Sequence, residues 1–343
     1  MHFFTICSNN YLAQAKVLGD SLRDQEPASA FLVVLVDELA DTIDYKALPF
    51  EVIPIRAIEP EIDALADKYN IIELNTCVKP RIFEYLRTER SAETAIYLDP
   101  DIKVYSPFTE VHQAFDEGSS IVLTPHIFSP IPRDGKTPGE NAFLNFGIYN
   151  LGFIAVRYTP ESSRFISWWK DWTYQSGYFN VKDGMFVDQL PINLVPLFFG
   201  EVSILKHPGY NMAPWNLHER YLSRFGEKIL VNDKDQLRFF HFSSFRLDSP
   251  LWPGAFYTRF SIDDRPDLSI VSNDYNADLK KAGYSGYITL PCAYVVRQKK
   301  RMEEQTRSEW QKKPPVKRLL LRVIRRVTPF VKRVMRSAVN SFL

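Results

Sequence analysis

The segment Ala95-Ile-Tyr-Leu-Asp99-Pro-Asp101-Ile-Lys-Val104 places two carboxylates directly after a short apolar run. Because residues i and i+2 of an extended chain point to the same side of the backbone, Asp99 and Asp101 are expected to face one way. Pro100 cannot donate a hydrogen bond to a neighbouring strand, which favours the acids lying where strand pairing ends. Mg²⁺ and Mn²⁺ prefer one or two carboxylates together with substrate phosphates. The segment therefore predicts a metal site at a strand end.

The Asp-x-Asp pattern alone is not specific. It recurs at Asp233-Lys-Asp235, in a polar turn where the two acids are expected only to be solvated. A phosphatase of the haloacid-dehalogenase type also carries Asp-x-Asp after a strand, but on its first strand and with Thr or Val two residues after the second acid. Here that position is Lys103 and the strand is not the first. The hydrophobic strand before Asp99 favours a functional site there.

Short β-rich runs alternate with helical patterns on both sides of this segment. Strands are expected at 2–7, 31–36, 51–55, 95–98, 120–124, 147–157 and 238–242, and helices at 11–23, 60–87, 160–176 and 185–199. This alternation predicts an α/β fold whose mostly parallel sheet is covered on both faces. The Pro- and Gly-containing stretch 129–139 is a candidate lid, and 261–287 is polar and turn-rich.

The overall composition is that of a globular chain. It has 343 residues, of which 45% are hydrophobic and 24% charged, with a formal net charge of +1, which excludes general disorder and a surface built wholly for nucleic acid. Cys7, Cys77 and Cys292 form no Cys-x-x-Cys, so neither a disulfide framework nor a thiolate zinc site is indicated. With no signal peptide and no apolar stretch of about 18 residues, the protein is expected to stay in the compartment where it is made.

The C-terminal residues differ in charge from the rest of the chain. Residues 311–343 hold ten Lys or Arg and no acid, which leaves residues 1–310 with 32 basic and 41 acidic residues. Drawn as a helix, 314–343 has valines on one face and arginines on the other, typical of a segment that lies on an anionic membrane. The alternatives are a helix packed on a partner and a nucleic-acid-binding arm; the absence of interleaved aromatic residues argues against nucleic acid.

Taken together, the motifs resemble those of GT-A-fold, nucleotide-sugar-dependent glycosyltransferases, closest to the retaining enzymes of family 8 and related bacterial surface-polysaccharide enzymes. The resemblance covers roughly residues 1–260 and implies a Rossmann-like GT-A sheet. Asp99 and Asp101 match the metal-binding DxD motif, and His241, in Phe-Phe-His-Phe-Ser-Ser-Phe, matches a late third metal ligand. The resemblance thus implies Mn²⁺ or Mg²⁺ as cofactor.

Further residues match the parts of this family that contact the donor. The positions with implied donor contacts are Ile6, Ser8, Asn10 and Tyr11 in the first strand and the loop that follows it, Lys79 and Arg81 in Val-Lys-Pro-Arg, and Asn150 and Gly152 in Asn-Leu-Gly-Phe. Asp188 and Gln189 match the Asp-Gln pair beneath the anomeric carbon and are the implied catalytic residues. The family commonly reads His-x-x-Gly-x-x-Lys-Pro-Trp; here Ser244 replaces the Gly, and either Arg246 or no residue at all serves as the cation for the diphosphate.

Each of these residues also has a structural interpretation. His241 could be a core histidine with satisfied hydrogen bonds, Asp188 a helix cap, and Asn150 a turn residue. Three other residues, Tyr210, Trp215 and His218, could stack on an acceptor sugar or simply pack.

The resulting expectation is a metal-dependent glycosyltransferase, which moves a sugar from a nucleotide-sugar, first of all a UDP-sugar, to a glycan or lipid-linked oligosaccharide with retention. The alternative is an inactive GT-A module that binds glycans or assembles with a partner. We expect a glycosyltransferase domain at 1–260, a polar extension at 261–313 and a basic amphipathic tail at 314–343. The protein would be cytoplasmic and peripheral on the inner membrane, with no nucleic-acid partner.

Overall fold

The computed structural model describes residues 1–248, 252–253 and 256–312. The chain divides into two compact units, Met1–Tyr294 and Val295–Leu343. The helix α11 (Ala293–Lys312) supplies the described part of the second unit. The expected basic tail, 314–343, lies outside the described residues. Within the described part of the chain, no helix is both long and apolar enough to cross a bilayer.

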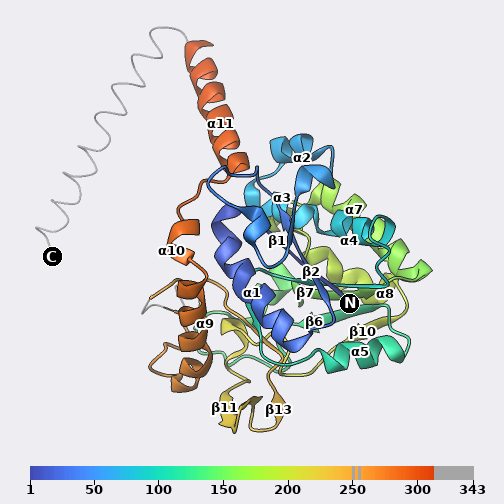
Figure 1. Ribbon diagram of the computed structural model, residues 1–343, viewed down its shortest axis with the longest axis vertical. Coiled ribbons are helices and arrows are strands. Elements are labelled where there is room, and N and C mark those ends of the chain that lie inside the picture. Colours follow the sequence, from blue (N-terminus) through green and yellow to red (C-terminus); the bar gives the residue numbers. More distant parts are fainter. Residues whose placement is uncertain (249–251, 254–255, 313–343) are drawn as a thin grey trace, which may run out of the picture. The chain divides into compact units, whose positions relative to one another are not determined.

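A sheet forms the centre of the first unit (Figure 1). It has seven strands in the order β10-β6-β7-β4-β1-β2-β3. Only β7 runs antiparallel to its neighbours within this sheet; every other pairing is parallel. The expected α/β fold with a mixed, mostly parallel sheet is therefore confirmed. The strands are β1 (His2–Cys7), β2 (Ala30–Leu35), β3 (Glu51–Pro54), β4 (Thr94–Leu98), β6 (Ile121–Pro125), β7 (Tyr149–Arg157) and β10 (Val202–Ile204).

Helices cover both faces of this sheet, as its apolar strands require. Alternate residues of β1 face opposite ways: Phe4 packs with Phe83 and Trp169, whereas Phe3 packs with Leu18 and Phe108. The first face thus carries α4 (Lys79–Thr88) and α7 (Pro160–Ser176), and the second carries α1 (Leu12–Gln25) and α5 (Thr109–Asp116). Two short helices, α2 (Ile62–Lys68) and α3 (Ile71–Cys77), precede α4.

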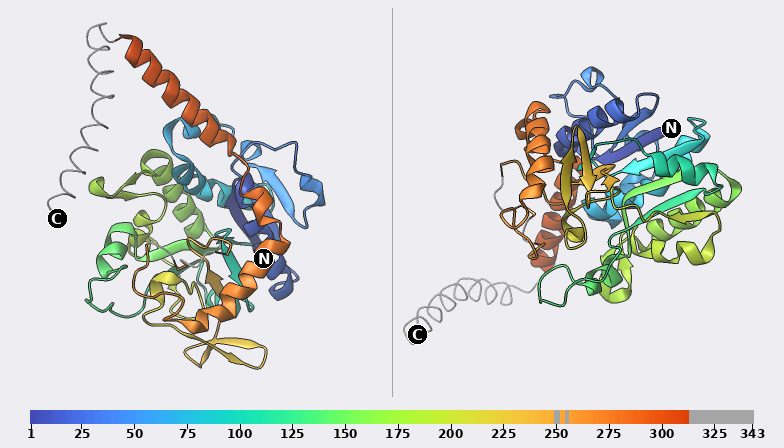
Figure 2. Two further views of the ribbon diagram at one scale, coloured as in Figure 1. Left: turned by 90° about the vertical axis from the view of Figure 1, so that its left-hand side faces the viewer. Right: turned by 90° about the horizontal axis from the view of Figure 1, so that it is seen from below.

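A second, smaller strand pair lies directly after β4. β5 (Ile102–Val104) pairs antiparallel with β14 (Phe239–His241), and His241 stands opposite Ile102 in the register. The three residues between β4 and β5 therefore join the large sheet to this pair. The hairpin of β11 (Leu222–Phe225) and β12 (Lys228–Val231), extended by β13 (Asp235–Gln236), projects from the body (Figures 1 and 2).

The stretch 261–287 is more ordered than its polar composition suggests. It forms α9 (Ser269–Lys281) and α10 (Tyr284–Tyr287), and α9 packs beside α1 (Figure 1). The expectation of a turn-rich segment is wrong because Val271, Tyr275 and Leu279, four residues apart, form a narrow buried stripe among polar neighbours. This stretch belongs to the same compact unit as the sheet.

The stretch 185–199 is less regular than expected. Instead of one helix it contains the short strand β9 (Met185–Phe186), which pairs with β8 (Phe179–Asn180), then a 3₁₀ turn (Leu190–Leu194) and α8 (Val195–Phe198). Pro191 and Pro196 lie near the starts of the last two pieces, where a missing N–H is tolerated. The stretch 129–139 has no regular structure, as expected, and leads into α6 (Glu140–Phe146).

Candidate functional site

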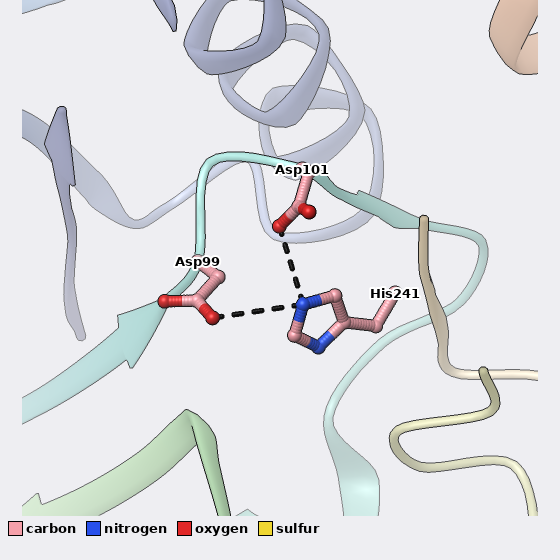
Figure 3. A group of neighbouring side chains, drawn as sticks. All are labelled: Asp99, Asp101 and His241. Carbon is pink, nitrogen blue, oxygen red and sulfur yellow. Dashed lines mark ion pairs between the residues drawn. The ribbon is translucent and has the colours of Figure 1, made fainter. Parts of the chain in front are cut away.

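Asp99, Asp101 and His241 converge at the carboxyl end of β4 (Figure 3). Nε2 of His241 lies 3.2 Å from Oδ1 of Asp101 and 3.6 Å from Oδ2 of Asp99. One ligand atom from each residue lies within 4.8 Å of the other two. Two carboxylates and one imidazole at this spacing fit a divalent cation such as Mn²⁺ or Mg²⁺, which accepts oxygen ligands and, in the case of Mn²⁺, imidazole.

Backbone hydrogen bonds hold the two acids between the strands. The N–H of Asp99 donates to the carbonyl of Gly152 in β7 at 2.8 Å. The carbonyl of Asp101 accepts from the N–H of Phe242, also at 2.8 Å, so this acid is tied to the residue that follows His241. The Tyr97 hydroxyl donates to Oδ1 of Asp99 at 2.6 Å and leaves Oδ2 facing the histidine. The acids are thus fixed by both sheets.

The imidazole of His241 lies against bare backbone on one side. A Cβ atom at Gly152 would lie 2.4 Å from Cε1 and 2.7 Å from Nδ1 of the ring, so no larger residue fits there. The rings of Trp215 and His241 pack edge to face, with a centroid distance of 5.0 Å and an interplanar angle of 81°. Gly152, expected to approach the donor, thus makes room for a candidate metal ligand.

The charges of the three residues depend on one another. Burial raises the pKa of Asp99, while His241 and Lys79 oppose the rise. Burial would lower the pKa of His241, but Asp101 and Asp99 outweigh it and the pKa is raised. Each carboxylate therefore stabilises a positive charge at Nε2, where either a proton or a metal cation can supply it.

Lys79 and Asp188 form a buried ion pair behind the acids. Nζ of Lys79 lies 2.6 Å from Oδ2 of Asp188, donates to the carbonyl of Leu151 at 2.9 Å, and sits 4.1 Å from the ring centroid of Tyr97. Burial raises the pKa of Asp188 and Lys79 opposes it. Since the side chain of Asp188 binds Lys79, it is not a helix cap. Lys79 also lowers the pKa of Asp99, so its charge acts on Asp99 as well as on Asp188.

Gln189 and Arg81, two other expected site residues, have different surroundings. Oε1 of Gln189 accepts from the N–H of Leu151 at 2.9 Å, and its Nε2 donates to the carbonyl of Phe146 at 2.7 Å. Arg81 lies close to Glu84 and Glu59 rather than the acids of the site.

A cleft of about 960 Å³ opens beside Asp101. Its lining includes Asn10, Tyr11 and Arg246, for which the family resemblance implies donor contacts. Burial, together with Asp101, raises the pKa of Tyr11 to about 12. Ser244, which stands where the family has Gly, has φ 61°, a conformation that glycine adopts readily.

Two members of the first-strand set do not line this cleft. Ile6 belongs to the hydrophobic core, and the buried hydroxyl of Ser8 donates to the carbonyl of Val36 at 3.0 Å. They support the loop that carries Asn10 and Tyr11 rather than reaching the cleft.

The far wall of the cleft comes from the C-terminal part of the unit, which sequence reasoning missed. Tyr275 and Leu279 of α9, Tyr284 of α10 and Ile288 line it. Only the four-residue spacing of the apolar positions in α9 could have signalled a packed helix there. The resemblance did not extend past residue 260.

The three acceptor candidates lie in different surroundings. Tyr210 is 1% exposed, packs on Phe108 in the core, and donates to Glu110 at 3.0 Å, so the packing interpretation holds for it. The ring of His218 faces the carbonyl of Ser129 at 3.4 Å. Of the three, Trp215 is the one that contacts His241.

The candidate lid, 129–139, is attached to residues 256–260. The hydroxyl of Thr137 donates to the carbonyl of Phe256 at 3.0 Å, and Thr137 and Thr258 exchange backbone and side-chain bonds. The guanidinium of Arg259 pairs with Asp134 and reaches the carbonyls of Pro132, Lys136 and Pro138. The two segments therefore form one layer, joined through a buried arginine.

No family model matches the chain. The uncharacterized protein YfnF of Bacillus subtilis (strain 168) is 24% identical over 251 residues, which make up 72% of this chain and 82% of YfnF.

Several solved structures are similar to this chain. The galactosyltransferase LgtC, in complex with donor and acceptor sugar analogues, is 16% identical with a TM-score of 0.47, over 85% of this chain and 98% of LgtC. The glycosyltransferase GlyE of Streptococcus pneumoniae TIGR4 is 15% identical with a TM-score of 0.46, over 85% of this chain and 65% of GlyE. Mouse xyloside xylosyltransferase 1 is 14% identical with a TM-score of 0.44, over 71% of this chain and 97% of that structure. Each of these three solved structures is named as a glycosyltransferase of some kind.

Proposed function

We propose that the protein is a metal-dependent glycosyltransferase that uses a nucleotide-sugar donor. The observation that carries the proposal is the convergence of Asp99, Asp101 and His241 beside the cleft that Asn10, Tyr11 and Arg246 line. A cleft of about 960 Å³ is of a size that encloses a nucleotide-sized ligand. The family resemblance of the sequence supports the same assignment, and a UDP-sugar is the first donor class to test.

The chemistry divides between the cation and the protein. When bound by Asp99, Asp101 and His241, Mn²⁺ or Mg²⁺ supplies positive charge to the departing diphosphate. Tyr11 and Asn10 bind the nucleoside, and Arg246 binds the diphosphate by charge-assisted hydrogen bonds. The anomeric carbon exchanges its bond to the diphosphate oxygen for one to the acceptor oxygen, and the acceptor's proton leaves with the nucleoside diphosphate. Retention of the anomeric configuration is proposed from the family resemblance.

Asp188 is proposed to act as a fixed negative charge behind the donor sugar. Its pairing with Lys79 at 2.6 Å keeps the carboxylate in place. Burial raises the pKa of Asp188 and the charge of Asp99 raises it further, so the two acids lie within electrostatic range. Such a charge stabilises an oxocarbenium-like sugar in the transition state. Gln189 would hold the β7 backbone, and Asn150 with it, beside that sugar.

The decisive experiment is a screen of nucleotide-sugars for Mn²⁺-dependent release of the nucleotide. The wild-type protein is expected to release nucleotide from one donor class, and the variants Asp99→Asn and Asp101→Asn are expected to lose most of this activity. Full metal-dependent release by both variants would contradict the proposal. Tight nucleotide binding without release from any donor would support the inactive, glycan-binding module instead.

The acceptor side is proposed to be a glycan or lipid-linked oligosaccharide at an anionic membrane, with the basic residues 314–343 in contact with that surface. Each Lys or Arg near an anionic leaflet contributes about 1 kcal/mol. Deleting residues 314–343 is expected to abolish co-sedimentation with phosphatidylglycerol vesicles and to leave donor hydrolysis intact. Unchanged sedimentation would reject the membrane role and favour a protein partner for the tail.

A further inference from the structure

Asn211 lies beside the imidazole of His241, in the stretch between β10 and β11. It is fully buried, and its Oδ1 lies 3.3 Å from Nδ1 of His241. Its φ of 53° is in the left-handed region, which asparagine adopts more readily than most residues. The carboxylates of Asp99 and Asp101 face the opposite ring nitrogen, Nε2. The ring thus contacts one amide and two acids, from different sides.

The orientation of the amides in this region follows from backbone groups whose role is not ambiguous. The N–H of Gly152 can only donate, and it meets the side chain of Asn150 at 3.0 Å, so that atom must be Oδ1. The same oxygen lies 2.9 Å from the side chain of Asn211, which must therefore present its Nδ2. The second hydrogen of that Nδ2 goes to Oγ1 of Thr124 at 3.0 Å. The remaining atom of Asn211, its Oδ1, therefore faces His241.

A second backbone group independently fixes the orientation of the Asn150 amide, through His126. The carbonyl of Ile148 can only accept, and it lies 3.3 Å from Nδ1 of His126. His126 then presents an unprotonated Nε2, which accepts from Nδ2 of Asn150 at 3.1 Å. Burial lowers the pKa of His126 to about 3, which agrees with a neutral ring. Both ends require the same orientation of Asn150, and hence of Asn211.

These oriented hydrogen bonds determine the tautomer of His241. Because Oδ1 of Asn211 only accepts, Nδ1 of His241 carries the hydrogen, and the lone pair of Nε2 faces Asp99 and Asp101. A lone pair facing two carboxylates is repulsive unless a cation lies between them. The network therefore orients a neutral imidazole as a metal ligand. A partner on the second nitrogen commonly fixes a ligating histidine in this way.

We propose that Asn211 is a positioning residue for the metal site: it holds His241 as the Nδ1–H tautomer, with Nε2 aimed at the cation held by Asp99 and Asp101. The proposal rests on the proposed metal site. Asn211 does not itself contact the cation. Thr124 and Asn150 act one step further out, by using both hydrogens of the Asn211 amide and so preventing it from flipping.

The first measurement is the tautomer of His241 in the metal-free protein, by ¹⁵N-detected NMR at alkaline pH. Wild-type His241 is expected to be protonated at Nδ1. Asn211→Gly, which tolerates the positive φ and removes the amide, is expected to shift the ring toward the Nε2–H form. An Nε2–H tautomer in the wild-type protein would overturn the proposal.

The second measurement is the Mn²⁺ dissociation constant, by electron paramagnetic resonance without donor or acceptor. Asn211→Gly is expected to bind Mn²⁺ about 10-fold more weakly. Asn211→Asp loses both donated hydrogen bonds but retains an acceptor for the Nδ1–H of His241. Its Mn²⁺ dissociation constant is expected to stay within about threefold of the wild-type value. A merely structural role of Asn211 would not predict this rescue. Thr173→Val, which loses a buried bond to the carbonyl of Cys77, is the control for general destabilisation.

The outcomes separate this proposal from the proposed function. If wild type binds Mn²⁺ and folded Asn211→Gly binds it equally well, the positioning role is wrong and the metal site stands. If wild type binds no Mn²⁺, the metal site is wrong, and the NMR measurement still decides whether Asn211 sets the tautomer.

Discussion

Nζ of Lys79 lies 2.6 Å from Oδ2 of Asp188, and both side chains are 2% exposed. Removing one partner of such a pair leaves an uncompensated buried charge, which costs about 3–5 kcal/mol. Lys79→Met is therefore expected to lower the free energy of unfolding by that amount, measured by urea denaturation. The double variant Lys79→Met/Asp188→Leu is expected to lose less than the single one, because no charge remains buried.

The exposed pair of Arg56 and Asp63, at 2.8 Å, provides the matched control. Arg56→Met is expected to cost less than about 1 kcal/mol, because solvent screens an exposed pair. If Lys79→Met were as mild as Arg56→Met, the buried pair would not stabilise the site as its geometry indicates.

Gly152 is expected to be as important for metal binding as the ligands themselves. In Gly152→Ala the new Cβ would lie 2.4 Å from Cε1 of His241, so the ring must leave the position in which its Nε2 faces Asp99 and Asp101. We expect Mn²⁺ affinity to fall about 10-fold or more, measured by calorimetric titration. Gly286→Ala is the control, since nothing lies within 4 Å of a Cβ there. Equal Mn²⁺ affinity in the two variants would contradict the conclusion that the backbone of Gly152 confines the imidazole of His241.

The DxD segment could be interpreted from sequence because its signal is local. An apolar strand, a proline and two acids lie within a few residues, and strand geometry alone places both carboxylates on one side. The contribution of His241 came from family resemblance, because only the antiparallel pairing of β5 with β14 brings it to the acids. Alternation of strands and helices was enough to predict the sheet.

Other parts of the site depend on tertiary contacts that leave little local trace. Nothing near Asn211 in the sequence indicates that its amide faces His241, since its partners Thr124 and Asn150 come from β6 and β7. Tyr210 was a reasonable sugar platform by type, yet its ring fills a gap beside Phe108. A residue's type predicts what it can contact, whereas packing decides what it does contact.

Stability should depend on His126 as the pH falls. Burial lowers the pKa of His126 to about 3, whereas an unfolded histidine titrates near 6.5. The neutral ring of His126 contributes fully to the free energy of unfolding at pH values above its pKa in the unfolded chain. This contribution is lost as the pH falls toward the pKa in the folded protein, because only the unfolded chain takes up the proton. At pH 5 the loss relative to pH 8 is about 2 kcal/mol.

The prediction is tested with His126→Gln, whose free energy of unfolding is expected to fall less between pH 8 and pH 5 than that of the wild type. His112→Gln, at a half-exposed position, is expected to follow the wild-type pH dependence. Parallel pH profiles for wild type and His126→Gln would show that the ring is charged in the folded state.

The stretch beyond residue 260 is expected to support the site. Tyr275 of α9 stacks on Phe242 with ring centroids 3.8 Å apart and an interplanar angle of 5°, and Phe242 directly follows His241. Tyr275→Ala is expected to destabilise the protein by about 3–5 kcal/mol in urea denaturation, as for other buried aromatic residues. Phe225→Ala, at a 75% exposed position, is expected to change it by less than about 0.5 kcal/mol. A mild effect of Tyr275→Ala would place α9 outside the cooperative unit.

Arg246 is the candidate cation for the diphosphate, although Leu247 stands where the motif of the resembled family has lysine. It lines the cleft that holds Asp101, and no carboxylate pairs with it within residues 1–248, 252–253 and 256–312. A cation facing a cleft without a counter-ion is suited to an anionic ligand, and a charge-assisted bond to a phosphate is stronger than a neutral one. Arg246→Gln is therefore expected to lower kcat/KM for the donor about 10-fold or more, and Arg246→Lys to lose less. Arg224→Gln, on the projecting β11, is expected to behave as wild type. An unchanged kcat/KM in Arg246→Gln would show that this arginine does not help to bind the diphosphate. The lysine of the family motif would then have no substitute in this chain.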